Sequence, residues 1–221
     1  MKIKDLEVIR TSSPLHKTAG TNWLFVKILT DTDIVGWGEG SLQYKDSALE
    51  AEICDMKKFL INKNPLNIED IWTSLFRKVT WSGGAVTMSA ISAIDLALWD
   101  IKGKAYGVPV YDLVGGKTRD KVKVYANGWF ENISLSSPTT RKESPKLYAE
   151  SASKLVDDGW KALKFYPFGG PQVTTPEQIF DGVNLVEAVR SSIGNLVDIG
   201  VDIRARLNTW SASRVEKQLR P

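Results

Sequence analysis

Cysteine and histidine are nearly absent from this sequence. The one cysteine, Cys54, has no partner for a disulfide within the 221 residues, which favours a reducing compartment. Cys54 lies in an amphipathic helical stretch, where we expect it to be a small buried hydrophobic residue. The one histidine is His16.

Long apolar runs are missing as well. No segment approaches the roughly 20 consecutive apolar residues that a membrane-spanning helix needs. The opening residues, MKIKDLEVIR, contain no apolar signal core. We therefore expect a cytoplasmic protein with no membrane partner.

Charge of one sign is also scarce. The 29 lysines and arginines nearly balance the 26 aspartates and glutamates, which leaves a net charge of +3. No basic run is long enough to follow a phosphate backbone, so we expect no nucleic-acid partner. The length is sufficient for one large or two small globular domains.

Strand patterns open the sequence and helical patterns follow. Three strands are predicted, over residues 3–10, 22–30 and 34–39. The turn-forming residues between the last two indicate an antiparallel meander. Helical periodicity then covers three segments, residues 47–61, 68–79 and 85–106. Residues 1–116 are therefore predicted to form an α+β domain.

The pattern changes after residue 116 to strands and helices in alternation. Strands are predicted over residues 122–126, 162–166 and 196–204. Helices are predicted over residues 144–158, 176–192 and 211–219. Such alternation indicates a parallel sheet with βαβ connections. Residues 117–221 thus form three strand–helix units, fewer than the eight of a closed (β/α)8 barrel, which takes about 250 residues.

A lysine stands in the middle of one apolar strand, in the segment WKALKFYPFGG (residues 160–170). Because side chains on a strand alternate between faces, Lys164 shares one face with Ala162 and Tyr166. A charged side chain on such a strand needs a solvated position, a partner or an ion.

The last predicted strand carries ionisable residues on one face. Asp202 and Arg204 fall toward its carboxyl end, where parallel α/β architectures form their sites, and Asp198 falls toward the opposite end. Lys164 and Tyr166 occupy the corresponding end of the neighbouring strand. These four side chains are predicted to meet, although a salt bridge between Lys164 and Asp202 that only fills the barrel interior is an alternative explanation.

A long ordered pattern covers the third helix and the loop after it, AISAIDLALWDIKGKAYGVPVYDLVGG (residues 90–116). This pattern closely resembles the signature of the enolase superfamily, in its mandelate racemase and muconate lactonizing enzyme branch. The resemblance extends to GWGE at residues 36–39 and to the strands with Lys164 and Asp202. Two carboxylates of the signature helix, Asp95 and Asp100, are expected to be structural, with Asp100 paired to Lys104 one turn on.

The resemblance implies an α+β capping domain followed by α/β, the latter being the first three strand–helix units of a modified (β/α)8 TIM-type barrel. Enzymes of this family bind Mg²⁺ through carboxylates on consecutive strands. They abstract the proton next to a substrate carboxylate and stabilise the resulting enediolate. Lys164 corresponds to the first lysine of the family's Lys-x-Lys motif, which neutralises the substrate carboxylate, and Asp202 to the first metal ligand.

Two positions depart from the family pattern. Tyr166 stands where the second lysine, the usual base, is expected, and a tyrosine is a poor base at neutral pH. Arg204 stands where many acid-sugar dehydratases have a histidine, so it cannot act as a general acid but could bind a substrate hydroxyl or carboxylate. The segment KFYPFGGP nevertheless looks most like that of acid-sugar dehydratases.

The capping domain is expected to supply specificity through the loop at residues 15–21, which contains His16. His16 is either a solvated loop residue or a contact to a polyhydroxy acid. Trp23 and Trp81 could line the pocket, but we expect a core position for each.

The resemblance implies dehydration of a small-molecule carboxylate, an acid sugar, to a 2-keto-3-deoxy acid. A racemase, epimerase or cycloisomerase of the same branch is the nearest alternative. An alternative of another class is a non-catalytic folded fragment, because the other metal ligands and the base are absent from these residues. The 221-residue chain alone is therefore expected to be inactive, and we expect the protein to be a homo-oligomer.

Overall fold

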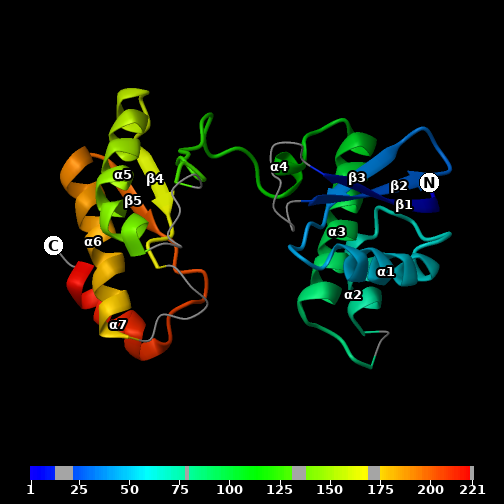
Figure 1. Ribbon diagram of the computed structural model, residues 1–221. Coiled ribbons are helices and arrows are strands. Elements are labelled where there is room, and N and C mark those ends of the chain that lie inside the picture. Colours follow the sequence, from blue (N-terminus) through cyan, green and yellow to red (C-terminus); the bar gives the residue numbers. More distant parts are fainter. Residues whose placement is uncertain (13–21, 78–79, 131–137, 169–174, 220–221) are drawn as a thin grey trace. The chain divides into compact units, whose positions relative to one another are not determined.

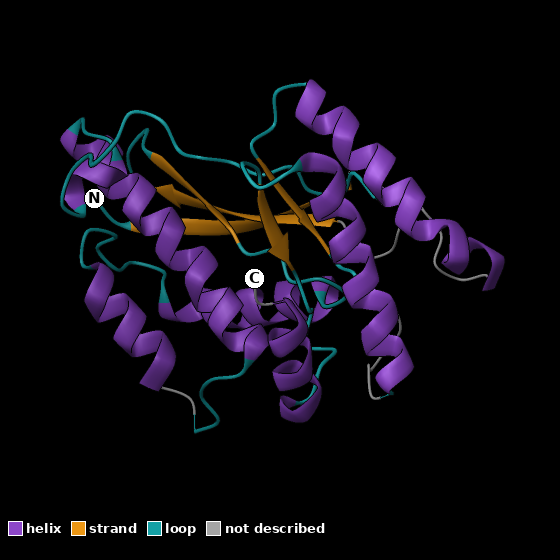
Figure 2. Cartoon of the chain, turned by 90° about the vertical axis from the view of Figure 1, so that its left-hand side faces the viewer, coloured by secondary structure: helices purple, strands orange, loops and turns teal. Residues whose placement is uncertain are grey.

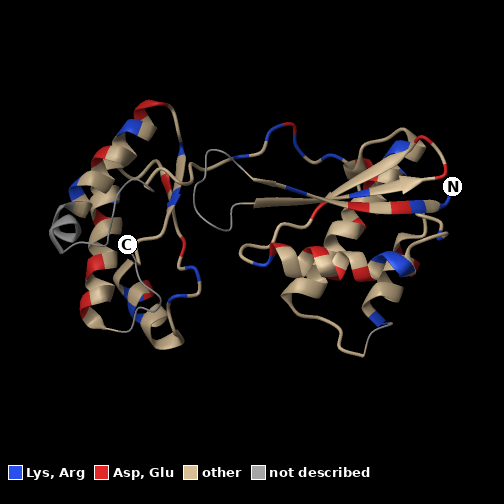
Figure 3. Ribbon diagram, turned by 45° about the vertical axis from the view of Figure 1, so that its right-hand side comes forward, with Lys and Arg blue, Asp and Glu red and all other residues tan. Residues whose placement is uncertain are grey.

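The computed structural model describes residues 1–12, 22–77, 80–130, 138–168 and 175–219 (Figure 1). The chain divides into two units, Met1–Asp120 and Lys121–Pro221, whereas the sequence predicts a boundary between residues 116 and 117. Each unit combines strands with helices (Figure 2). Charges of both signs are interspersed along each unit (Figure 3). Among the described residues, no helix has the length and apolar character that crossing a lipid bilayer requires.

The first unit begins with a three-stranded antiparallel sheet. Its strands are β1 (Ile3–Ser12), β2 (Asn22–Thr30) and β3 (Val35–Glu39), in the order β1-β2-β3. This order confirms the predicted meander. Alternate residues of β2, namely Leu24, Val26 and Ile28, are fully buried in the core of the unit, as expected for a sheet that is covered on one face.

Helices α1 (Asp46–Met56) and α3 (Ala85–Tyr106) pack on this sheet (Figure 1). The 3-10 helix η1 (Lys57–Phe59) follows α1, α2 (Ile68–Arg77) packs on α3 and η1, and α4 (Val110–Leu113) packs on α3. The three predicted helices are confirmed, although the first ends at Met56 and continues as η1. Helix α3 ends at Gly107, whose φ of 69° lies in the left-handed region that favours glycine.

The signature helix α3 packs directly on β3. A Cβ atom at Gly36 would lie 2.2 Å from the carbonyl oxygen of Ala97, and one at Gly38 would lie 2.0 Å from that of Ala93. Only glycine allows the strand and the helix backbone to approach so closely. The two glycines of GWGE and the alanines of the signature are therefore explained by one close contact.

Asp100 and Lys104 fasten the same contact. The Asp100 carboxylate accepts hydrogen bonds from the Trp37 backbone N–H (2.8 Å) and from Lys104 Nζ (2.5 Å). Lys104 Nζ also donates to the carbonyl oxygen of Val35 at 2.8 Å. The expected pairing of Asp100 with Lys104 is confirmed, and both residues join the end of α3 to β3.

Three predicted core positions in the first unit are wrong. Cys54 is exposed, because it follows the buried Ile53 by about 100° around α1 and so points away from the sheet. Trp81 precedes α3 and is 90% exposed. Trp23 is 47% exposed on the outer face of β2, where it stacks on Phe25 with the ring centres 6.4 Å apart.

The second unit is built on a parallel pair of strands. They are β4 (Ala162–Phe165) and β5 (Asp198–Val201). The helices are α5 (Pro138–Asp157), α6 (Pro176–Ile193) and α7 (Thr209–Leu219). The predicted parallel arrangement of alternating strands and helices is confirmed. Helix α6 begins with a capping box between Thr175 and Gln178, which satisfies backbone N–H groups of its first turn.

All three strands of the second unit are shorter than predicted, β4 by one residue at its end. In residues 122–126 only Ala126 pairs, as a single bridge to Leu163. With Ala126 beside Leu163, residues 122–124 lie level with residues that precede β4, so no strand residue is available to pair with them. The strand β5 spans Asp198–Val201 instead of residues 196–204. It cannot extend through residue 204, because Arg204 and Ala205 have φ angles of 42° and 55°, which no strand accommodates.

We expect Gly38→Ala to destabilise the first unit by about 2 to 3 kcal/mol. The new methyl group would collide with the Ala93 carbonyl oxygen, a backbone atom that can move only if α3 moves from the sheet. Urea unfolding followed by tryptophan fluorescence measures the change. Ser92→Ala, on the exposed side of α3, is the control and should change stability by less than about 0.5 kcal/mol. Equal stability of the two variants would contradict the close contact.

Candidate functional site

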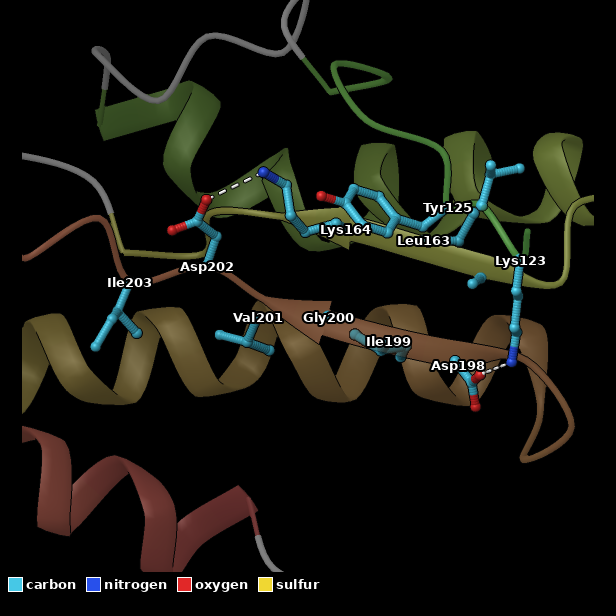
Figure 4. A pocket seen from close by; sticks show the side chains of 12 residues that line it. Lys123, Tyr125, Leu163, Lys164, Asp198, Ile199, Gly200, Val201, Asp202 and Ile203 are labelled. Atoms are coloured by element: carbon cyan, nitrogen blue, oxygen red, sulfur yellow. Dashed lines mark hydrogen bonds and ion pairs between the residues drawn. The ribbon is translucent and has the colours of Figure 1, made fainter. Parts of the chain in front are cut away.

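Lys164 and Asp202 meet where β4 and β5 end. Lys164 lies beside Gly200 in the parallel register, and its Nζ donates to Asp202 Oδ2 at 3.1 Å (Figure 4). A Cβ atom at Gly200 would lie 3.3 Å from Lys164 Cγ, so the lysine side chain packs against a residue of β5 that has no side chain. Gly200 therefore leaves the room that Lys164 needs to reach Asp202.

Asp202 is fixed by its backbone as well as by Lys164. Its N–H donates to the carbonyl oxygen of Phe165 at 2.9 Å, and its Oδ1 accepts from the Arg204 N–H at 2.9 Å. Burial raises the pKa of Asp202, but the hydrogen bonds from Lys164 and the Arg204 N–H, together with both positive charges, lower it more. The net pKa is below the ordinary aspartate value, so Asp202 is ionised at neutral pH.

Tyr166 and Arg204 complete the predicted group of four. Arg204 lies in a turn and not on a strand, so the predicted alternation is wrong for Arg204. Its guanidinium carbon nevertheless lies 4.9 Å from the centre of the Tyr166 ring, and Lys164 Nζ lies 5.4 Å from the same centre. Phe130 packs against that ring in a T-shaped arrangement, with the ring centres 4.6 Å apart. His16 lies outside the described residues.

Two neighbours of Lys164 were not anticipated. The Tyr125 ring centre lies 5.7 Å from Lys164 Nζ, and Trp129 Nε1 donates to the Lys164 carbonyl oxygen at 3.0 Å. Tyr125 immediately precedes Ala126, the residue that bridges to Leu163. An aromatic side chain within the first predicted strand of the second unit was the signal that could have identified it. Nothing in the sequence pattern indicates the contact of Trp129, which follows a turn at Gly128.

A pocket of about 640 Å³ lies along these strands. Lys164 and Asp202 stand at one end, and a second ion pair, Lys123 with Asp198, stands at the other (Figure 4). The hydrogen bond and the charge of Lys123 lower the pKa of Asp198. The predicted position of Asp198 at the end opposite to Asp202 is confirmed.

The described residues do not by themselves form a complete magnesium site. Within those ranges, no group of three or more His, Cys, Asp and Glu side chains is close enough together to hold a metal ion. Asp202 offers one hard oxygen ligand at the end of the pocket, whereas Mg²⁺ favours six oxygen ligands, several of them water. Further ligands would have to come from elsewhere.

Comparisons with known proteins agree with the resemblance in the sequence. Residues 3–115 match the family model of the mandelate racemase / muconate lactonizing enzyme, N-terminal domain. The D-galactonate dehydratase of Pectobacterium atrosepticum is 36% identical over 200 residues, which are 90% of this chain and 49% of that protein. The D-galactonate dehydratase of Xanthomonas axonopodis pv. citri is 34% identical over 210 residues, 92% of this chain and 50% of the relative.

A solved structure gives the same result. A member of the enolase superfamily from Salmonella Typhimurium matches with a TM-score of 0.83 and 31% identity, over 99% of this chain and 58% of that chain. The chain thus spans about half the length of the curated relatives it matches.

Lys164→Gln should raise the pKa of Asp202. The substitution removes the hydrogen bond and the charge that lower this pKa, while the burial that raises it remains. The stability that the wild-type carboxylate contributes is present above about pH 4 and is lost as the pH falls through its lowered pKa. The variant should therefore lose less stability on acidification. Carbon-13 NMR titration of the Asp202 carboxyl measures the pKa directly.

Lys123→Gln is the matched control for this titration. It removes the same charge from the other end of the pocket and should raise the pKa of Asp198 while leaving that of Asp202 in place. A pKa of Asp202 that responds equally to both variants would mean that general charge, and not the Lys164 contact, determines it.

Proposed function

Because the chain belongs to the mandelate racemase / muconate lactonizing enzyme family of the enolase superfamily, we propose that it supplies the capping domain and the first barrel strands of an acid-sugar dehydratase. The proposal rests on one observation: a lysine and an ionised aspartate meet at the carboxyl ends of adjacent parallel strands. Family relatives named D-galactonate dehydratase support the acid-sugar substrate.

The proposed reaction removes water from an acid sugar. A base takes the proton from the carbon next to the carboxylate, the hydroxyl group on the following carbon takes up a proton from an acid and leaves as water, and the resulting enol tautomerises to a 2-keto-3-deoxy acid. Negative charge grows on the carboxylate oxygens as the proton leaves. The ammonium group of Lys164 would stabilise that charge, and such a preorganised charge is among the largest contributions an enzyme makes.

Asp202 would be one ligand of a Mg²⁺ ion, which in such enzymes supplies positive charge for the same oxygens. The remaining ligands and the proton-abstracting base would have to come from outside the described residues. Tyr166 stands in the place of the second lysine of the family motif, which argues against a two-base racemase that works through this strand. We assign Tyr166 to substrate contact, since a phenol hydroxyl both donates and accepts hydrogen bonds.

The intact mass of the protein from its source decides which polypeptide to assay. A mass of 24.6 kDa corresponds to the 221 residues, and a mass near twice that value corresponds to the length of the relatives. We expect no turnover of D-galactonate by the 221-residue chain with Mg²⁺, because it lacks a set of metal ligands among its described residues. Turnover by that chain would contradict this explanation.

A chain of the relatives' length should convert D-galactonate, or another acid sugar, to a product one water lighter by mass spectrometry. Lys164→Met should lower kcat/KM by about 100-fold or more, and Lys146→Met, on the exposed side of α5, should lower it less than about threefold. A product with the same mass as the substrate would contradict dehydration and would indicate an isomerase of the same family.

A further inference from the structure

The ladder of hydrogen bonds on one edge of β4 stops beside Lys164. The Ala126 N–H donates to the carbonyl oxygen of Ala162, and the Lys164 N–H donates to that of Ala126, both at 2.9 Å. If this parallel ladder continued, the N–H of Gly128 would donate to the carbonyl oxygen of Lys164. It does not continue, because Gly128 has a φ of 75°, which turns the chain out of the sheet.

A side chain supplies the donor that the ladder lacks. Trp129 Nε1 donates to the Lys164 carbonyl oxygen at 3.0 Å. The opposite edge of β4 is held by backbone, since the Asp202 N–H donates to the carbonyl oxygen of Phe165 at 2.9 Å. The last two carbonyl groups of β4 are therefore both held, one by an indole and one by the aspartate that pairs with Lys164.

Aromatic packing fixes the orientation of the Trp129 indole. Three ring centres lie close to its own, those of Phe165 at 5.4 Å, Phe130 at 5.5 Å and Tyr148 at 5.7 Å. These three neighbours are at most 5% exposed, so the indole has little freedom to turn. Phe130 also packs on the Tyr166 ring, and one aromatic cluster thus supports both site residues that β4 and its end provide.

We propose that Trp129 is a positioning residue, whose indole N–H holds the end of β4 so that Lys164 stays where the carboxylate of an acid would bind. This inference rests on the proposed function, since it takes Lys164 as the group that stabilises charge on that carboxylate. A charge contributes most when its position is fixed before the reaction begins, and a displacement of about 1 Å can cost about 100-fold in rate. Because the indole replaces a backbone donor, the chain turns at Gly128 without leaving the Lys164 carbonyl oxygen unpaired.

Amide hydrogen exchange tests the positioning in the 221-residue chain. The Phe165 N–H belongs to the same peptide unit as the Lys164 carbonyl group, and the Asp202 N–H binds the next carbonyl group, so both amides report opening of this strand end. Trp129→Phe removes the indole donor and keeps an aromatic ring. We expect it to speed exchange at these two amides about tenfold more than at the buried Val189 on α6.

Trp160→Phe is the matched control for the exchange measurement. Trp160 packs against the same hydrophobic core as a partly buried ring, and it precedes β4 at the other end of the strand. Its replacement should change the exchange of the three amides by one common factor. If Trp129→Phe also gives one common factor, the indole contributes only general stability and the inference is wrong.

Kinetics of a chain of the relatives' length test the consequence for Lys164. Trp129→Phe should lower kcat/KM by about tenfold, and Trp160→Phe should change it by less than about twofold. In the Lys164→Met background Trp129→Phe should have almost no further effect, because a residue that acts through Lys164 then has nothing left to position. Equal losses in both backgrounds would overturn the inference.

Failure of the proposed function would give a different result. If Lys164→Met leaves kcat/KM unchanged, Lys164 takes no part in the reaction, and this inference fails together with the proposed role of Lys164. If Lys164→Met is slow while Trp129→Phe is as active as the wild type, only the positioning role of Trp129 fails, and the acid-sugar site stands.

Discussion

The ion pair between Lys164 and Asp202 depends on the register of two parallel strands. Leu163 and Phe165 on β4 are almost fully buried against the hydrophobic core of the second unit, and this burial determines which face Lys164 occupies. A slip of one residue would exchange the two faces and expose the apolar pair. Apolar burial therefore places the polar group, and Gly200 on β5 leaves the path to Asp202 open.

The first unit was predictable because its constraints are local and repeated. Spacings of three and four residues identify α3 over its whole length, and the signature letters within it have physical causes. Ala93 and Ala97 allow the approach of Gly38 and Gly36, and Asp100 holds the backbone of β3. A family resemblance that is carried by such residues indicates a fold first, since none of them lies in the pocket.

The strand predictions that failed in the second unit were those that depend on neighbours. Alternation along the sequence marks residues 122–126 as a strand, yet a strand also needs a partner at its own level, and β4 begins too late to provide one. Alternation likewise places Arg204 on the strand face, but the turn after Val201 breaks it. Arg204 still reaches Tyr166 because the turn redirects a long side chain over the ring. Periodicity describes elements, whereas turns and edges depend on contacts between them.

A structural salt bridge and a functional site are not exclusive explanations for Lys164 and Asp202. Their side chains are 21% and 31% exposed, so the pair stands at the mouth of a pocket and is not sealed in a core. Pairs with this access to water contribute about 0 to 1 kcal/mol to stability. Little free energy therefore opposes an exchange of partners, in which Lys164 turns to an incoming carboxylate and Asp202 to an incoming cation. The same charges that stabilise each other in the free chain are those that a charged ligand would require.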